Sequence, residues 1–135
     1  MSAQVFIRSL LDVIWNQGHT PKIIVDTTHG DVVVPKHVAE QYGDRLPLDL
    51  DASYPMNIAF DDAGLHADLS FNHTVTRCTF PWRRIYLVVD RELGKGAIIE
   101  AHRPGKVPLV VDAAGEEVPK PMPGWSPKVI KGGKN

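Results

Sequence analysis

Apolar and polar residues alternate in two neighbouring segments, LHADLSF (65–71) and TVTRCTF (74–80). A period of two residues is typical of a β-strand that buries one face and exposes the other. Only Asn72 and His73 separate the two segments, and Asn tolerates the left-handed dihedral angles that tight turns need. The pattern predicts an antiparallel hairpin with residues 70–75 as its exposed rim.

The chain around this hairpin also has the pattern of short strands. KIIVDTT (22–28) and DVVVP (31–35) flank a turn at His29-Gly30, and PKHVAEQYG (35–43) has the Pro start and Gly end of a short helical turn. The remaining strands are predicted in LPLDLD (46–51), MNIAF (56–60), RIYLVVD (84–90) and AIIE (97–100). A series of short strands separated by turns predicts a mainly β domain, either a small Sm-like antiparallel barrel or a two-sheet β-domain.

The first residues have the period of a helix. Ser2 is a suitable N-cap and Gly18 a suitable stop for a helix over residues 2–17. Its apolar residues cover an arc of about 160°, whereas one buried face needs about 100°. Two interpretations stay open: burial on the protein's own sheet alone, or one side on the sheet and the other on a second subunit. Arg8 and Asp12 argue against a signal peptide or membrane span, and we expect a cytoplasmic protein.

Charge and composition change near residue 100. Residues 1–100 hold nine Lys and Arg against thirteen Asp and Glu, while residues 101–135 hold six against three. An acidic body repels phosphate backbones, so no nucleic acid is expected as the main ligand. Six of the eleven prolines follow residue 100. We therefore expect a folded domain over residues 1–100, a flexible linker over 101–124 and a tail over 125–135. Within the linker, VPLVVD (107–112) could add to a sheet edge.

The sequence contains no catalytic or metal-binding motif. The six histidines have no metal-ligand spacing, and His66 and Asp68 are best interpreted as polar residues of a solvated strand face. Cys78 lies among β-branched and aromatic residues, which favours a buried, inert thiol. We therefore expect neither an enzyme nor a metal or other cofactor.

Two binding functions remain open. Extended peptides can pair with exposed strand edges, and the loop 51–57 offers Tyr54 and Met56 as apolar contacts beside the rim at 70–75. The alternative is an Sm-like barrel that binds RNA. Its cations and stacking residues would be Lys22, Arg77, Arg83, Arg84, Trp82 and Tyr86.

Several segments, taken in order, resemble one known family. These are HTPKIIVDTT directly after the first helix, VVVP before the helical turn, LPLDLDASYPMNIAFDDAGLHADLSFNHTVTRCTFPW, and IYLVVDRELGKGAI, which is similar to a run of the type I-Y-A-R-E-N-G-x-G. Over about residues 5–100, and again at the tail, the chain resembles the stringent starvation protein B family. Members of that family are bacterial adaptors that deliver tagged proteins to the ClpXP protease.

The resemblance implies a homodimer and a peptide groove. The first helix would form the dimer interface, with Val5, Ser9 and Asp12. The ligand would be the degradation tag added to stalled ribosomal products. The groove residues that the resemblance implies, together with loop and rim residues beside them, are Leu69, Ser70, Phe71, His73, Tyr54 and Asn57. Asn72-His73 stands where the family usually has Gly-Gly.

The tail resembles the family's docking peptide, roughly R-P-x-L-R-V-V-K, which binds the N-terminal zinc-binding domain of the unfoldase ClpX. SPKVIKGGKN (126–135) has the same character, and the implied docking residues are Pro127, Lys128, Val129, Ile130 and Lys131. A flexible linker of this length would reach roughly 25–30 Å. The trailing GGKN departs from the family pattern.

Overall fold

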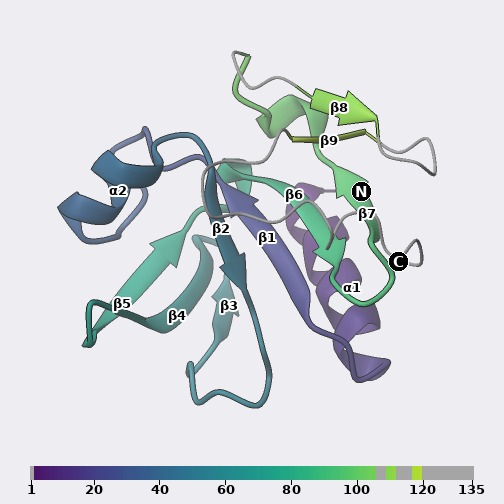
Figure 1. The fold of residues 1–135 in the computed structure, drawn as a ribbon, viewed down its shortest axis with the longest axis horizontal. Coiled ribbons are helices and arrows are strands. Elements are labelled where there is room, and N and C mark those ends of the chain that lie inside the picture. Colours follow the sequence, from purple (N-terminus) through teal and green to yellow (C-terminus); the bar gives the residue numbers. More distant parts are fainter. Residues whose placement is uncertain (1, 106–108, 112–116, 120–135) are drawn as a thin grey trace.

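The computed structural model describes residues 2–105, 109–111 and 117–119 (Figure 1). The helix α1 (Ala3–Asn16) confirms the helix predicted over 2–17. The hydroxyl of Ser2 caps it by accepting the backbone N–H of Val5 at 3.2 Å. Just beyond the helix, Gly18 has φ +76°, a value that glycine adopts without strain.

Four antiparallel strands form the larger sheet, in the order β2-β1-β6-β7. Their bounds are Pro21–Val25 (β1), Leu46–Asp49 (β2), Ile85–Asp90 (β6) and Lys95–Ile98 (β7). Every residue of the central strands β1 and β6 is buried. This agrees with their continuous apolar runs, since a strand covered on both faces has no polar side.

The smaller sheet has three antiparallel strands in the order β3-β4-β5. These are Ala59–Asp61 (β3), Gly64–Phe71 (β4) and Thr74–Phe80 (β5). The predicted alternation in β4 is confirmed, because Leu65, Ala67 and Leu69 are buried while the residues between them are partly exposed. In the described part of the chain the sheets do not close into a barrel, so the two-sheet alternative is the one that forms.

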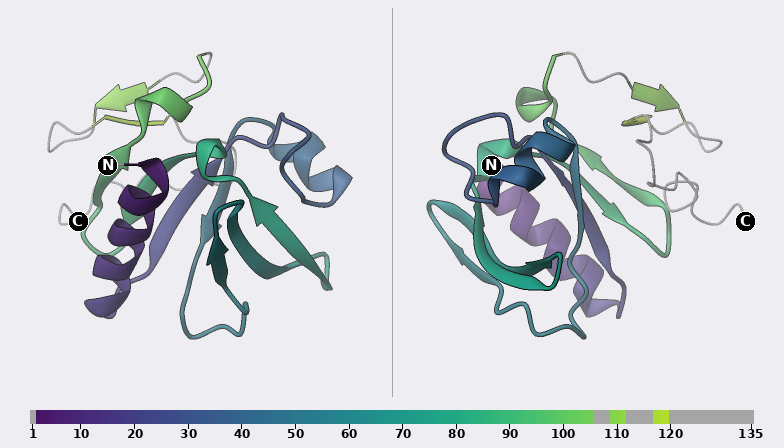
Figure 2. Two further views of the ribbon diagram at one scale, coloured as in Figure 1. Left: turned by 180° about the vertical axis from the view of Figure 1, so that it is seen from behind. Right: turned by 60° about the vertical axis from the view of Figure 1, so that its left-hand side comes forward.

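One hydrophobic core joins the two sheets and the helix. α1 lies alongside β1 and β6 and also contacts the 3-10 turn η1 (Trp82–Arg84) (Figures 1 and 2). Its buried residues are Ile7, Leu11 and Ile14. They share the core with Ile23, Val25, Leu46, Leu50, Met56, Leu65, Ala67, Leu69, Cys78, Phe80, Trp82, Ile85 and Val88.

Two predicted strands differ from the structure. DVVVP (31–35) is not a strand and forms no hairpin with β1; among the described residues, its one ladder contact is a bridge from Val33 to Thr79 on β5. The reason is that both edges of β1 are already paired, one with β2 and the other with β6. The strand predicted over 56–60 is confined to β3, which begins at Ala59. The short helix α2 (Lys36–Tyr42) lies between its predicted Pro and Gly.

The chain stays in contact with the larger sheet just after β7. There the 3-10 turn η2 (Glu100–His102) is fixed by the N–H of Ile99 on the Tyr86 carbonyl (2.8 Å) and by His102 Nδ1 on the Ile85 carbonyl (2.9 Å). Further on, β8 (Leu109–Val111) pairs with β9 (Glu117–Pro119), so within the described residues the partner of 109–111 is β9 and not an edge of either main sheet.

The remaining linker residues and the predicted docking residues 127–131 lie outside the described residues. Within the described part, no helix combines the length and the apolar character that crossing a bilayer requires.

Candidate functional site

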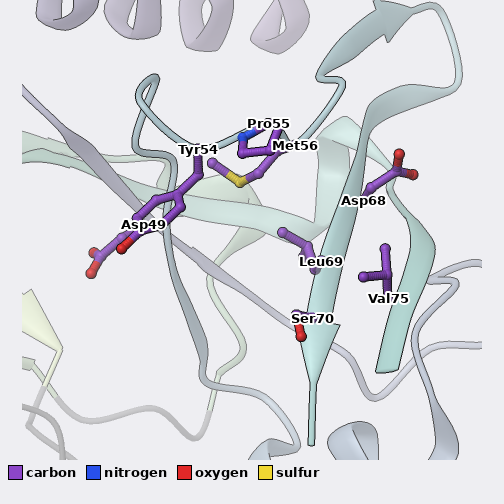
Figure 3. A pocket seen from close by; sticks show the side chains of 8 residues that line it. All are labelled: Asp49, Tyr54, Pro55, Met56, Asp68, Leu69, Ser70 and Val75. Atoms are coloured by element: carbon purple, nitrogen blue, oxygen red, sulfur yellow. The ribbon is translucent and has the colours of Figure 1, made fainter. Parts of the chain in front are cut away.

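A groove runs between the loop that follows β2 and the outer part of β4 and β5 (Figure 3). Its volume is about 290 Å³. Leu69 projects from β4 toward the loop that carries Tyr54 and Met56. The residues that line the groove are Asp49, Tyr54, Pro55, Met56, Asp68, Leu69, Ser70 and Val75. Apolar groups dominate this lining, which suits a hydrophobic side chain of a ligand.

The loop 51–57 forms one wall of the groove and is held by its own hydrogen bonds. The Asp51 carboxylate accepts the backbone N–H of Ser53 at 2.9 Å and its hydroxyl at 2.7 Å, and the N–H of Tyr54 donates to the Asp51 carbonyl. This turn leaves Tyr54 67% exposed at the rim, while Met56 is only 8% exposed. Met56 therefore forms part of the floor, and Tyr54 stands exposed at the rim.

Three side chains fix the end of this loop on β4; we call Asn57, Asp68 and Arg77 the Asp68 clasp. Asn57 Nδ2 donates to Asp68 at 2.8 Å, and Arg77 donates both to Asp68 (3.0 Å) and to the Asn57 carbonyl (2.8 Å). The Asn57 carboxamide, and after it the Arg77 guanidinium, hold the pKa of Asp68 below its ordinary value of 3.8. The carboxylate is therefore ionised at neutral pH and binds the loop to the sheet.

β4 offers an open backbone edge to the groove. The N–H of Asp68 donates to the Met56 carbonyl at 2.7 Å, and β3 pairs with β4 only as far as His66. Backbone groups two residues apart on a strand point to the same side, so the N–H and C=O of Ser70 lie on the side of β4 on which the N–H of Asp68 meets Met56, which is the side of the groove. Within the described residues, no strand pairs with Ser70 on that side.

The hairpin that joins β4 to β5 has the tightest kind of turn. Phe71 pairs with Thr74, and the two residues between them, Asn72 and His73, have φ values of +51° and +67°. Positive φ at both central positions is the signature of a type I′ turn, in which Gly is favoured and Asn tolerated. Asn72-His73 therefore holds the backbone in the conformation that a Gly-Gly pair adopts without strain.

Three of the six groove residues predicted from the sequence line this groove: Tyr54, Leu69 and Ser70. Asn57 belongs to the Asp68 clasp beside it, and His73 is exposed at the hairpin tip. Phe71, with Ser70, borders a second hollow next to α2.

Sequence reasoning missed four lining residues: Asp49, Pro55, Asp68 and Val75. Val75 carried a signal, because it is an apolar residue opposite Ser70, on the solvated face of the hairpin, and it is 68% exposed.

The outer face of α1 carries the predicted dimer residues. Val5, Ser9 and Asp12 are exposed and, with Arg8, border a shallow hollow of about 220 Å³. Val5 is 50% exposed, as is Val13 at 54%. The wide apolar arc of the helix therefore divides into a buried side, which packs on the sheet, and a side that this chain alone leaves uncovered.

In the part of the chain that the structure describes, one cluster has the ligand types of a metal site: a ligand atom from each of His19, Asp90 and Glu92 lies within 4.8 Å of the others. Each is already engaged in hydrogen bonds. Asp90 accepts the backbone N–H groups of Glu92 and Leu93 and binds His19 Nδ1 at 2.7 Å, while Glu92 accepts the N–H of Thr20. The cluster links the start of β1 to the β6–β7 turn. Its imidazole and carboxylate groups therefore have a structural role.

The cations proposed for RNA binding are all engaged with carboxylates. Arg77 binds Asp68, Arg83 and Arg84 both bind Asp31, and Lys22 binds Asp49. Pairing of this kind leaves little charge to attract a phosphate backbone. His66 and Asp68 do not form an acid–base pair, because His66 bonds to Thr79 and Asp61.

Fold and site together define a small two-sheet domain with an apolar groove, an open strand edge and an exposed helix face. The family model of stringent starvation protein B matches residues 2–124, and the chain belongs to this family. The family is one of protease adaptors and not of enzymes. No curated protein sequence matches the chain closely enough to count as a relative.

Proposed function

We propose that the protein is an adaptor that binds degradation-tagged proteins and tethers them to the ClpX unfoldase of the ClpXP protease. The tag added to stalled ribosomal products would lie in the groove as an extended peptide. The adaptor itself makes or breaks no bond. Degradation is faster because the tethered cargo meets the protease at a raised effective concentration.

The observation that carries this proposal is the coincidence of an apolar groove with an open strand edge in a member of an adaptor family. An extended peptide beside β4 would pair its backbone with the N–H and C=O of Ser70. One of its apolar side chains would lie on the floor formed by Met56 and Leu69, under the ring of Tyr54. Backbone pairing contributes affinity for a peptide of any sequence, and the apolar floor contributes selectivity for peptides with an apolar side chain at that position.

Two further features support the rest of the proposal. The exposed valines of α1, with the small Ser9 between them, offer a surface on which a second copy of the helix can pack closely. In the tail, Lys128 and Lys131 flank the apolar pair Val129-Ile130. Such a segment suits docking at a strand edge of ClpX, with the lysines steering the encounter. Two tails on one dimer would engage one hexameric unfoldase with increased avidity.

A titration of a fluorescent rescue-tag peptide with the full chain, followed by anisotropy, tests the groove. We expect micromolar or tighter binding. Val75→Arg places a long cation in the groove at an exposed position, so the fold should tolerate it, and affinity should fall at least about tenfold.

Leu93→Arg is the matched control, because Leu93 is also an exposed apolar residue (47%) but lies in the β6–β7 turn. Its affinity should equal that of the parent. Absence of binding by the parent, or equal affinity for both variants, would contradict the proposed site.

A further inference from the structure

The outer edge of β7 is a feature that the proposed function leaves unused. β7 is the last strand of the larger sheet, and its inner edge pairs with β6. Partners in an antiparallel ladder alternate between pairs that exchange hydrogen bonds and pairs that do not. Ile99 donates its N–H to Tyr86 at 2.8 Å, so Ala97, two residues earlier, also bonds to β6. The N–H and C=O of Gly96 and Ile98 therefore point away from β6, and within the described residues no strand pairs with them.

The opposite edge of the same sheet is protected. Leu50 donates its N–H to the Pro21 carbonyl at 2.9 Å, so the same alternation turns the backbone of Pro47 outward from β2. Proline has no N–H to offer, and on an edge strand it discourages the addition of a further strand. On β7, Gly96 presents an N–H and has no side chain. The larger sheet can therefore be extended more readily at β7 than at β2.

The side chains beside this edge are apolar on both faces of the sheet. Ala97 and Ile98 are neighbours in β7, so their side chains project to opposite faces, and both are half-buried. The turn before β7 carries Leu93, which is 47% exposed. An added strand would find an apolar neighbour on either face. An occupant that suits this edge has two consecutive apolar residues, one for each face.

The tail of the chain contains such a pair. Val129 and Ile130 are consecutive, and with the lysines on either side they make a segment, 128–131, of the same four-residue length as β7. The charges also have opposite signs. Residues 125–135 hold three Lys and no Asp or Glu, whereas Asp and Glu outnumber Lys and Arg in residues 1–100. The body therefore attracts the tail.

The tail begins within reach of this edge. β9 ends at Pro119, and the β8–β9 hairpin lies on the side of the molecule that carries β7, away from the β4–β5 hairpin (Figures 1 and 2). The nine residues from Pro119 to Lys128 can span up to about 30 Å. A segment tethered in this way meets the edge at an effective concentration on the order of millimolar, so weak pairing is sufficient.

Resting on the proposed function of the tail, we infer that residues 128–131 pair with the outer edge of β7 while the unfoldase is absent. The larger sheet then gains a strand next to Gly96 and Ile98. These tail residues are the ones proposed to bind ClpX, so one tail cannot make both contacts at once. The contact with β7 is therefore autoinhibitory, and ClpX has to displace the tail from it. The groove takes no part, so cargo binding is unaffected.

Amide hydrogen exchange, followed residue by residue by NMR, tests this contact in the full chain and in a chain that ends at residue 124. The amides of Gly96 and Ile98 should exchange at least about threefold more slowly in the full chain, because only there does the tail cover them. The amides of Lys95 and Ala97 bond to β6 and should exchange alike in both chains, which makes them an internal control. A chain that ends at residue 131 keeps the pairing segment and should behave as the full chain does.

The affinity for the isolated N-terminal domain of ClpX gives a second readout. A peptide of residues 125–135 has no β7 beside it, so it should bind this domain more tightly than the full chain does. If K is the ratio of docked to undocked tails, docking slows exchange by the factor 1 + K and weakens binding by the same factor. The two measured factors should therefore agree, at about three or more.

Equal exchange of Gly96 and Ile98 in the full chain and the chain that ends at 124 would overturn the inference. Slower exchange of all four amides alike, or equal measurable affinities of peptide and full chain for the ClpX domain, would do the same. Protection that persists without the tail and rises with protein concentration would assign the edge to a second copy instead. If the ClpX domain binds neither peptide nor full chain, the proposed function of the tail is wrong, and the exchange rates still decide the contact with β7.

Discussion

Two titratable side chains, Cys78 and Tyr86, lie in the core, and burial decides their protonation. Both are fully buried. Burial raises the pKa of Cys78 from 9.0 to about 11, and it raises that of Tyr86 as well. The Tyr86 hydroxyl donates to the Asp44 carbonyl at 2.8 Å, so the proton it retains has a structural role. The thiol predicted to be buried is confirmed as such, and its raised pKa leaves little thiolate at neutral pH.

These shifts predict a loss of stability in alkali. A group whose pKa is raised by folding stabilises the native state fully below its unfolded pKa, and this contribution is lost as pH rises to the folded pKa. For Cys78 the window is from pH 9 to about pH 11. Urea unfolding should show the free energy of unfolding falling by roughly 2–3 kcal/mol from this group in that window.

Cys78→Ala is the comparison for this prediction. The variant should be less stable at pH 8, because it leaves a small cavity, but its stability should fall less steeply between pH 9 and pH 11. Parallel curves for parent and variant would show that the thiol does not contribute.

At the scale of elements, sequence periodicity predicted most of the fold. The period of two in β4 and the apolar run of β6 predicted the bounds of both strands closely, because each pattern is local. The failures have non-local causes. DVVVP has strand propensity, but β1 pairs on one edge with β2 and on the other with β6, two strands that follow later in the chain, so no edge of β1 is left for it.

The candidate site was predictable to the same degree. The residues of β4 that border the groove follow from one segment and its resemblance to a family. Val75 comes from β5, which pairs with β4, whereas Asp49 comes from β2 in the other sheet, and only the packing of the two sheets brings it to the groove. The open edge at Ser70 depends on where β3 stops, which no local pattern specifies.

The turn between β3 and β4 gives a prediction about stability. Gly64 has φ +153°, and a Cβ atom there would collide with the backbone of Phe80 and Pro81. Gly64→Ala should therefore lower the free energy of unfolding by about 2 kcal/mol or more, measured by urea denaturation. Gly105→Ala is the control, since no atom of the described residues lies within 4 Å of the added methyl group, and its stability should stay within about 0.5 kcal/mol of the parent. Equal stabilities would contradict the packing of β4 against β5.

At the scale of the whole molecule, the proposed assembly depends on α1. The outer face of the helix, with Val5, Ser9 and Val13, makes no contact with the described body that buries it. Ser9→Arg should therefore leave the fold intact and convert the proposed dimer to a monomer in light scattering coupled to size exclusion. Glu40→Arg introduces the same side chain on exposed α2 and should remain dimeric. A monomeric parent, or a dimeric Ser9→Arg variant, would contradict this interface.

The proposed function also requires the groove and the tail of one molecule to act together. The folded body, with its acidic balance, would hold the cargo, while the basic segment 127–131 would hold the protease. If the proposed function is right, a chain without residues 125–135 should keep its groove and lose only the proposed tether. It should bind the rescue-tag peptide as tightly as the full chain does.

The most direct test of this account is the rate at which ClpXP degrades a tagged fluorescent protein at a concentration below its KM. We expect the full chain to accelerate degradation, and the chain that lacks residues 125–135 to give no acceleration although it still binds the tag. If the shortened chain accelerates degradation as much as the full chain does, the tail is not the tether and the account is wrong.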